Sequence, residues 1–182
     1  SGSKVHIWLS RAEVMALLDT CGDDVKGQRD RLALGLLVAA GLRRSEAVAL
    51  QFDDVKLQPV AGKMRAVLEV TGKGDKTRAV PISDNLAAAI DRWAAVVGGE
   101  GYILRSVNKG GTVNGSLSSS GLFGIVRDAG EAIGKPELAP HDLRRTYAQL
   151  GYDAGVPVTQ ISKLLGHASI KTTQRYLNLD LD

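Results

Sequence analysis

Apolar residues recur with the period of an α-helix along most of the chain. Ser10 and Glu13 have the spacing of a capping box, which marks the start of the first helical segment. In the second segment Leu32, Leu36 and Leu37 share one face. The pattern predicts helices at about residues 10–18, 26–40, 45–50, 84–97, 118–133, 141–154, 158–165 and 170–176.

The period changes between residues 53 and 82. Apolar positions alternate with other residues from Met64 to Val70, and a weaker alternation covers residues 79–82. Between these two segments, Gly72-Lys73-Gly74-Asp75 has the residue types of a hairpin turn. The pattern therefore predicts a mostly α-helical α+β protein that is interrupted by one small antiparallel sheet.

The composition fits one domain with a sizeable core. The chain has 182 residues and a single cysteine, Cys21, which excludes an internal disulfide and suits a reducing cytoplasm. No apolar run reaches the length of a membrane span, and no secretory signal is visible. Residues 1–3 have the composition of an expression-tag remnant. No histidine has a second ligand at metal-binding spacing, so we expect no metal.

The formal net charge of +3 is modest, but lysine and arginine occur in local clusters. Such clusters are usually solvated faces and indicate a nucleic-acid partner only if they converge in space. The clustered cations that we consider as DNA contacts are Arg44, Lys76, Arg78, Arg145, Lys171 and Arg175.

Reactive side chains concentrate near the end of the chain. Two of the three histidines, His141 and His167, lie there together with Arg144 and Tyr176. His141 and Arg144 are three residues apart, so on a helix they share a face. A guanidinium holds phosphate in a planar fork, imidazole moves protons near neutral pH, and a phenol can form a covalent intermediate. Each residue alone has an ordinary structural explanation, but together they indicate phosphoryl transfer.

Five segments in order strengthen this interpretation. They are Gly41-Leu42-Arg43-Arg44-Ser45-Glu46, Gly72-Lys73-Gly74, Pro140-His141-Asp142-Leu143-Arg144, Leu165-Gly166-His167, and Tyr176. This arrangement resembles the tyrosine recombinases, also called phage-type integrases, over nearly the whole chain from about Ser10. The resemblance implies their catalytic-domain fold, which is mostly helical with one three-stranded antiparallel sheet.

The resemblance also implies a role for each matching residue. Arg43 and Arg144 would clamp the scissile phosphate and stabilise the charge of the transition state. Lys73 would give a proton to the departing 5′ oxygen. His141 would be the acid–base partner near the nucleophile, and His167 would hydrogen-bond a phosphate oxygen.

Tyr176 would be the nucleophile and would form a 3′-phosphotyrosine with release of a 5′ hydroxyl. Glu46 and Asp142 would orient Arg43 and the His141 region. The family needs neither metal nor ATP, so no cofactor is expected. The expected partner is double-stranded DNA, bound in the bacterial cytoplasm at an attachment or crossover site during integration or excision of a phage or other mobile element.

Residues 4–182 match only the catalytic domain, and we expect the helical core-binding domain of these enzymes to be absent from this chain. The fragment is then expected to be a monomer, whereas the full-length protein would act as a homotetramer on DNA, with a directionality factor as a possible further partner. Only six residues follow Tyr176, which makes docking of the tail on a neighbouring subunit doubtful.

Two alternatives remain open. Residues 158–166 followed by 170–173 mimic a helix-turn-helix, which favours a DNA-binding regulator without catalysis. That hypothesis leaves Arg43, Lys73, His141 and Tyr176 unexplained. Type IB topoisomerases and telomere resolvases share the phosphotyrosine chemistry, but topoisomerases usually have lysine at the position of His141.

Overall fold

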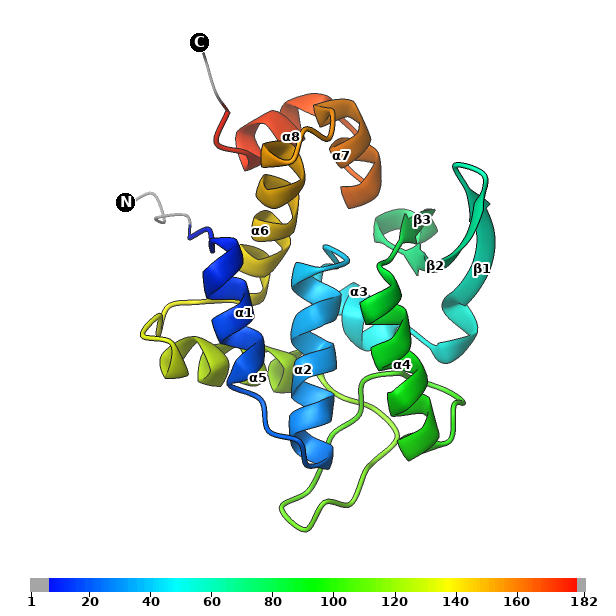
Figure 1. The fold of residues 1–182 in the computed structure, drawn as a ribbon, viewed down its shortest axis with the longest axis vertical. Helices are drawn as coiled ribbons and strands as arrows, with labels where there is room; N and C mark the ends of the chain where they lie inside the picture. The colour runs from blue at the N-terminus through cyan, green and yellow to red at the C-terminus, as the bar shows by residue number, and fades with distance from the viewer. Residues whose placement is uncertain (1–6, 180–182) are drawn as a thin grey trace.

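The computed structural model describes residues 7–179 of the chain. The helices are α1 (Arg11–Asp19), α2 (Val25–Val38), α3 (Arg44–Ala49), α4 (Asp84–Val97), α5 (Ser119–Ala132), α6 (Pro140–Asp153), α7 (Val158–Leu165) and α8 (Ile170–Tyr176). The strands are β1 (Val55–Val60), β2 (Lys63–Thr71) and β3 (Thr77–Pro81), with 3-10 turns at Phe52–Asp54 and Lys73–Asp75. The expected fold class, mostly helical with one three-stranded antiparallel sheet, is confirmed (Figure 1).

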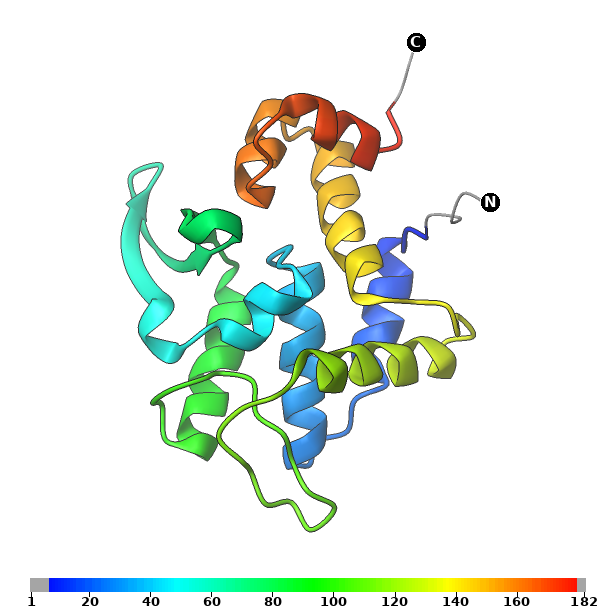
Figure 2. The same cartoon turned by 180° about the vertical axis from the view of Figure 1, so that it is seen from behind.

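The central element of the larger part of the molecule is α2, which packs against α1, α4, α5 and α6 (Figure 1; seen from behind in Figure 2). Every residue from Leu32 to Val38 is buried. The prediction of a single apolar face for α2 is therefore too narrow. A helix that is covered on all sides is apolar all round. Truncation of a fully buried leucine such as Leu36 costs about 2–5 kcal/mol of unfolding free energy.

The sheet has the order β1-β2-β3, with both pairs antiparallel. Val55 and Val80 both pair with Leu68, and this end of the sheet joins the main core. β1 and β2 are joined by a two-residue turn at Ala61 and Gly62, where φ is 51° and 82°. Positive φ at both positions is typical of a type I′ hairpin turn. The sequence pattern does not predict β1, because alanine is not a residue that signals this turn.

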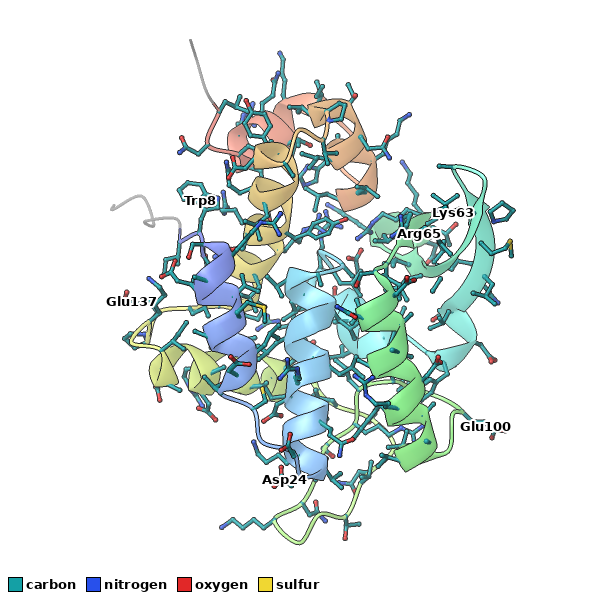
Figure 3. The ribbon with its side chains drawn as sticks, viewed as in Figure 1. Trp8, Asp24, Lys63, Arg65, Glu100 and Glu137 are labelled. Atoms are coloured by element: carbon teal, nitrogen blue, oxygen red, sulfur yellow. The ribbon has the colours of Figure 1, made fainter. Side chains whose placement is uncertain are left out.

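A second, smaller core lies between α6, α7 and α8. Its buried residues are Ala148, Ile161, Leu165 and Leu177. Helix α6 belongs to both cores, since Leu143 packs in the main core and Ala148 in the smaller one. The backbone N–H of Leu9 donates to Thr146 Oγ1 at 3.1 Å and ties the start of the described chain to α6. The preceding residue, Trp8, is labelled in Figure 3. The part of the molecule built on the main core and the part built on the smaller core therefore meet along α6.

Within residues 7–179, no helix is long and apolar enough to cross a bilayer.

Candidate active site

Arg144 connects the two parts of the molecule. Its Nη1 donates to the carbonyl of Gly41 and its Nη2 to the carbonyl of Leu165, both at 2.7 Å. Gly41 has φ +70°, and a Cβ there would lie 2.3 Å from the ring of Tyr147, so only glycine fits. Burial, followed by the positive charge of Arg43, lowers the pKa of Arg144 to about 10. The guanidinium is therefore held rigidly and remains charged at neutral pH.

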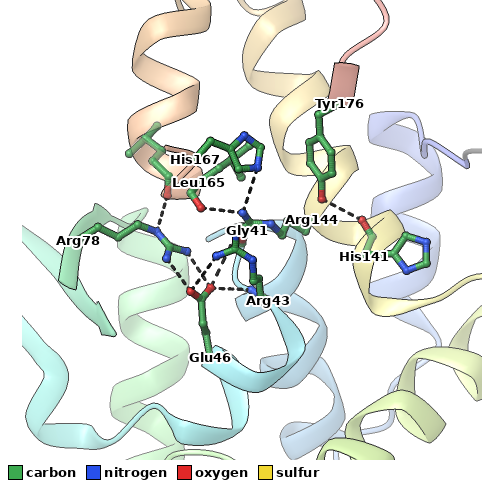
Figure 4. A network of polar contacts seen from close by, with 10 residues as sticks. Gly41, Arg43, Glu46, Arg78, His141, Arg144, Leu165, His167 and Tyr176 are labelled. Carbon is green, nitrogen blue, oxygen red and sulfur yellow. Dashed lines mark hydrogen bonds and ion pairs between the residues drawn. The ribbon is translucent and has the colours of Figure 1, made fainter. Parts of the chain in front are cut away.

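Glu46, on α3, is the buried anion of the site. Its Oε1 accepts the backbone N–H of Arg43 at 2.9 Å, and its Oε2 accepts Arg43 Nη1 at 3.3 Å. Arg78 donates to both carboxylate oxygens, at 2.7 and 2.8 Å, while Arg144 Nη1 is 3.9 Å away. Burial raises the pKa of Glu46, but hydrogen bonds from Arg78 and the Arg43 backbone more than offset it and lower the pKa overall. Three cations around one carboxylate leave the site positively charged (Figure 4).

Arg78 joins the sheet to the end of α7. Besides its two bonds to Glu46, its Nε donates to the carbonyl of Leu164 at 2.8 Å. Gly166 ends α7 with φ +75°, and a Cβ there would lie 3.1 Å from Arg78. The glycine in the Leu165-Gly166-His167 segment therefore lets the arginine approach the helix end closely.

His167 lies directly after this glycine and faces both Arg144 and α8. Its Nε2 is 3.5 Å from Arg144 Nη2, and its Nδ1 is 2.7 Å from Thr173 Oγ1. Burial, together with the charges of Arg144, Arg43 and Arg78, lowers the pKa of His167 to about 4. The imidazole is therefore neutral at physiological pH.

Tyr176 is held on several sides (Figure 4). Its ring meets that of His167 edge-on, with centroids 5.4 Å apart, and its hydroxyl donates to the carbonyl of His141 at 3.4 Å. The guanidinium of Arg145 lies 4.3 Å from the centroid of the Tyr176 ring, and Arg145 Nη1 donates to the Tyr176 carbonyl at 3.2 Å. Burial raises the pKa of Tyr176 more than the charges of Arg144 and Arg145 lower it. The phenol of Tyr176 therefore needs a base, or more positive charge nearby, to ionise at neutral pH.

His141 contributes its backbone to this contact, while its imidazole extends away from Tyr176 (Figure 4). The imidazole Nε2 lies 3.4 Å from Asp142 Oδ1, and the side chain is 44% exposed. Asp142 is fully buried, and its Oδ2 accepts the backbone N–H of Ala139 at the start of α6 at 2.9 Å. Asp142 thus fixes the helix start that carries His141 and Arg144.

Lys73 is exposed at the β2–β3 turn, and among residues 7–179 its side chain makes no hydrogen bond or ion pair. The base of the turn nevertheless lies against Glu46 and the three arginines around it, Arg43, Arg78 and Arg144, which we call the arginine cluster. A Cβ on Gly72 would lie 2.8 Å from Glu46 Oε2. Gly74 has φ 73° and Asp75 has φ 57°, which makes the turn tight. The turn thus reaches the arginine cluster while its lysine faces solvent.

A sequence model of the phage integrase family matches residues 7–181. The chain belongs to the phage integrase family. It is 38% identical over 157 residues to tyrosine recombinase XerC of Nitrobacter winogradskyi, covering 84% of this chain and 46% of that protein. It is 34% identical over 180 residues to a tyrosine recombinase of Pseudothermotoga lettingae, covering 97% of this chain and 57% of that protein.

Solved structures agree with this family assignment. XerA recombinase superposes with a TM-score of 0.77 at 25% identity, over 100% of this chain and 61% of that one. XerH recombinase in a post-cleavage complex with a palindromic difH substrate gives the same TM-score and identity, over 100% of this chain and 51% of that one. The chain spans about half the length of the curated relatives it matches.

The integrase-family site brings together most of the residues that the sequence singles out. Arg43, Arg144, His167 and Tyr176 converge, and Glu46 accepts hydrogen bonds from Arg43. His141 adjoins them through its backbone carbonyl. The remaining predicted catalytic residue, Lys73, lies on the neighbouring exposed turn. Among residues 7–179, no three His, Cys, Asp or Glu side chains gather as metal ligands would.

Two predicted DNA contacts need correction. Arg78 is only 11% exposed in its side chain, and all three guanidinium nitrogens donate within the protein. Arg145 is buried against Tyr176. Both were predicted as surface cations because sequence clusters do not show which members turn inward. The other four predicted contacts are exposed, namely Arg44, Lys76, Lys171 and Arg175.

The helix-turn-helix resemblance has a different explanation in this integrase-family domain. α7 and α8 do pack together, but the carbonyls of Leu164 and Leu165 accept arginine hydrogen bonds and α8 carries Tyr176. Thr173, which bonds His167, was not singled out from the sequence. Its position, one helical turn before Tyr176, is the signal that could have found it.

Proposed function

We propose that the protein is a site-specific DNA recombinase that cleaves and rejoins strands through a 3′-phosphotyrosine intermediate. One observation carries the proposal: the Tyr176 hydroxyl belongs to the same cluster as the His167 imidazole and the guanidiniums of Arg43 and Arg144. A nucleophile beside paired cations is the arrangement that attack on a phosphodiester requires.

The arginines would bind the scissile phosphate. Arg43 is 39% exposed in its side chain and can meet a phosphate from outside, while Arg144 lies deeper and supplies a fixed charge. Glu46 and Arg78 hold the pair in place before DNA arrives. Because such donors need no rearrangement during the reaction, they stabilise the growing charge of the transition state efficiently.

Tyr176 would attack the phosphorus, forming a bond between its oxygen and the 3′ phosphate while the bond to the 5′ oxygen breaks. The attacking phenol loses its proton to His141 or to solvent beside it, and Lys73 delivers a proton to the departing 5′ oxygen. The Tyr176 hydroxyl lies at the backbone carbonyl of His141, whose imidazole extends away, so the imidazole would turn toward the hydroxyl to take the proton directly. His167 would bind a phosphate oxygen. Rejoining reverses these steps and needs no ATP.

Double-stranded DNA at an attachment or crossover site would be the partner, in the cytoplasm, with integration or excision of a phage or other mobile element as the outcome. The exposed cations Arg44, Lys76, Lys171 and Arg175 would contact the DNA backbone. We further propose that the complete protein works as a homotetramer on DNA, with a directionality factor as a further partner, and that residues 4–182 alone are monomeric.

The test is covalent capture. Nicked suicide duplexes with randomised sequence around the nick would be mixed with the complete gene product, and adducts separated on denaturing gels. Adducts with the 3′ phosphate attached to protein are expected for the wild type and none for Tyr176→Phe, which keeps the ring packing. Adducts that persist in Tyr176→Phe would overturn the proposal, as would a wild type that forms none.

A further inference from the structure

We propose that Thr173 is a positioning residue that controls which ring nitrogen of His167 carries the proton, and that phosphate binding moves the proton from Nδ1 to Nε2. The inference rests on the proposed function, in which His167 contacts a phosphate oxygen. Thr173 is fully buried on α8, one turn before Tyr176, and its Oγ1 lies 2.7 Å from His167 Nδ1.

The contacts without DNA favour one tautomer. His167 is neutral, because burial and the charges of Arg144, Arg43 and Arg78 lower its pKa to about 4, so its ring carries a single proton. The guanidinium of Arg144 has no acceptor atom, and its Nη2 lies 3.5 Å from His167 Nε2. This contact favours a lone pair on Nε2, which places the proton on Nδ1, from where it is donated to Thr173 Oγ1.

A bound phosphodiester reverses the requirement at Nε2. Its non-bridging oxygens only accept hydrogen bonds, so a His167 that binds one must carry its proton on Nε2. The ring then loses the Nδ1 proton to water and gains one from water at Nε2, with no change in charge. Nδ1 becomes an acceptor, and the Thr173 hydroxyl must turn from acceptor to donor.

A hydroxyl suits this exchange because it can both donate and accept. A carboxylate at position 173 could only accept a hydrogen bond and would hold the proton on Nδ1. A valine there would leave Nδ1 without a hydrogen-bond partner. An imidazole nitrogen that is buried without a partner is costly in either tautomer. Thr173 thus keeps Nδ1 bonded before and after the proton moves, so the ring need not rotate away from Arg144 or Tyr176.

The tautomer is measurable in the 182-residue chain by ¹⁵N NMR of the His167 ring, assigned by comparison with His167→Gln. Without ligand we expect the proton on Nδ1 in the wild type and in Thr173→Ser, and a mixture of tautomers in Thr173→Val. Inorganic phosphate is then added until the Arg144 Nε–H signal stops moving, and the His167 proton is expected on Nε2.

The outcomes separate this inference from the proposed function. An Arg144 signal that does not respond to phosphate would count against the arginine pair as a phosphate site, and so against the proposed function. An Arg144 signal that responds while the His167 proton stays on Nδ1 would overturn the tautomer exchange alone. A proton found on Nε2 before phosphate is added, or protons on both ring nitrogens afterwards, would overturn it as well.

Kinetics in the complete gene product supply the second readout. On the captured suicide duplex, Thr173→Val should slow adduct formation by about threefold to tenfold, the value of one hydrogen bond, with DNA affinity unchanged. Thr173→Ser should restore the rate, and Thr172→Val, the same change at an exposed neighbour, should have no effect. Equal defects in Thr173→Ser and Thr173→Val would show that the methyl group matters rather than the hydroxyl. A wild-type rate for Thr173→Val would also overturn the inference.

Discussion

The arginine cluster and the β2–β3 turn lie side by side, yet they are built in opposite ways. In the cluster, Arg78 and Arg144 are fixed by hydrogen bonds to carbonyls and to Glu46. In the turn, Lys73 is exposed, and only the backbone at Gly72 approaches the cluster. Under the proposed function, the arginines that would bind the phosphate are already organised without DNA, whereas Lys73 would take its place only when DNA is bound.

The largest expected effect is in the cluster. Arg144→Ala should slow adduct formation by at least about 10²–10³-fold, because loss of one transition-state donor has that cost and this donor is charged. It also leaves the Gly41 and Leu165 carbonyls without their donor. Arg144→Lys keeps the charge but cannot reach both carbonyls in a planar fork, and should remain strongly impaired. A rate near wild type for Arg144→Lys would show that charge alone suffices.

The next effect is on stability. Glu46→Gln removes the only carboxylate that the structure shows among Arg43, Arg78 and Arg144, and should lower the free energy of unfolding by about 3–5 kcal/mol. Urea unfolding of the 182-residue chain measures this change. Glu131→Gln, at an exposed position of α5, is the matched control and should change little. Equal stability of the two variants would mean that the cluster is not held together by Glu46.

The exposed cations of α8 should contribute to DNA binding, whereas an exposed cation at the start of α2 should not. Lys171→Gln and Arg175→Gln should each weaken binding at all sequences and reduce the slope of log affinity against log salt by about one. Lys26→Gln, which changes an exposed lysine at the start of α2, serves as the control and should leave the slope unchanged. The slope is measured by fluorescence anisotropy with a labelled duplex, and an unchanged slope for Lys171→Gln and Arg175→Gln would remove α8 from the DNA interface.

The smallest effect concerns pH. The pKa of His167 is lowered from 6.5 to about 4, so between these values the unfolded chain takes up a proton that the folded protein resists. This contribution to stability is fully present above pH 6.5 and is lost as the pH falls towards 4. Urea unfolding of His167→Gln should therefore show a weaker loss of stability across this window than the wild type. Parallel curves for the two proteins would contradict the lowered pKa.

The sequence identified which residues gather at the candidate site better than it identified their contacts. Residue type and order were enough for His141, Arg144, His167 and Tyr176, because their segments carry the family resemblance. The bounds of the helices were also predicted to within about two residues, since caps such as Ser10, Ser83 and Ser118 mark helix starts. The β1 strand was not predicted, because its alanine-glycine turn gives a weak signal.

The roles of Arg78, Arg145 and Thr173 could not be predicted from the sequence. Arg78 bonds Leu164 across 86 positions, and Arg145 meets Tyr176 across 31. Such pairs depend on how β3 packs on α7 and how α6 packs on α8, which the local sequence pattern does not determine. A cation in a sequence cluster therefore gives no indication of whether it lies on the surface or packs against Tyr176.

The division between a fixed phosphate clamp and a lysine placed by DNA is tested most directly by a substrate whose 5′ bridging oxygen is replaced with sulfur. Thiolate leaves without a proton, so the substrate removes the need for a general acid. On this duplex the complete gene product with Lys73→Ala should form adducts at close to the wild-type rate, while Arg144→Ala should remain defective. A Lys73→Ala protein that stays as slow on sulfur as on oxygen, while the wild type cleaves both, would contradict the account.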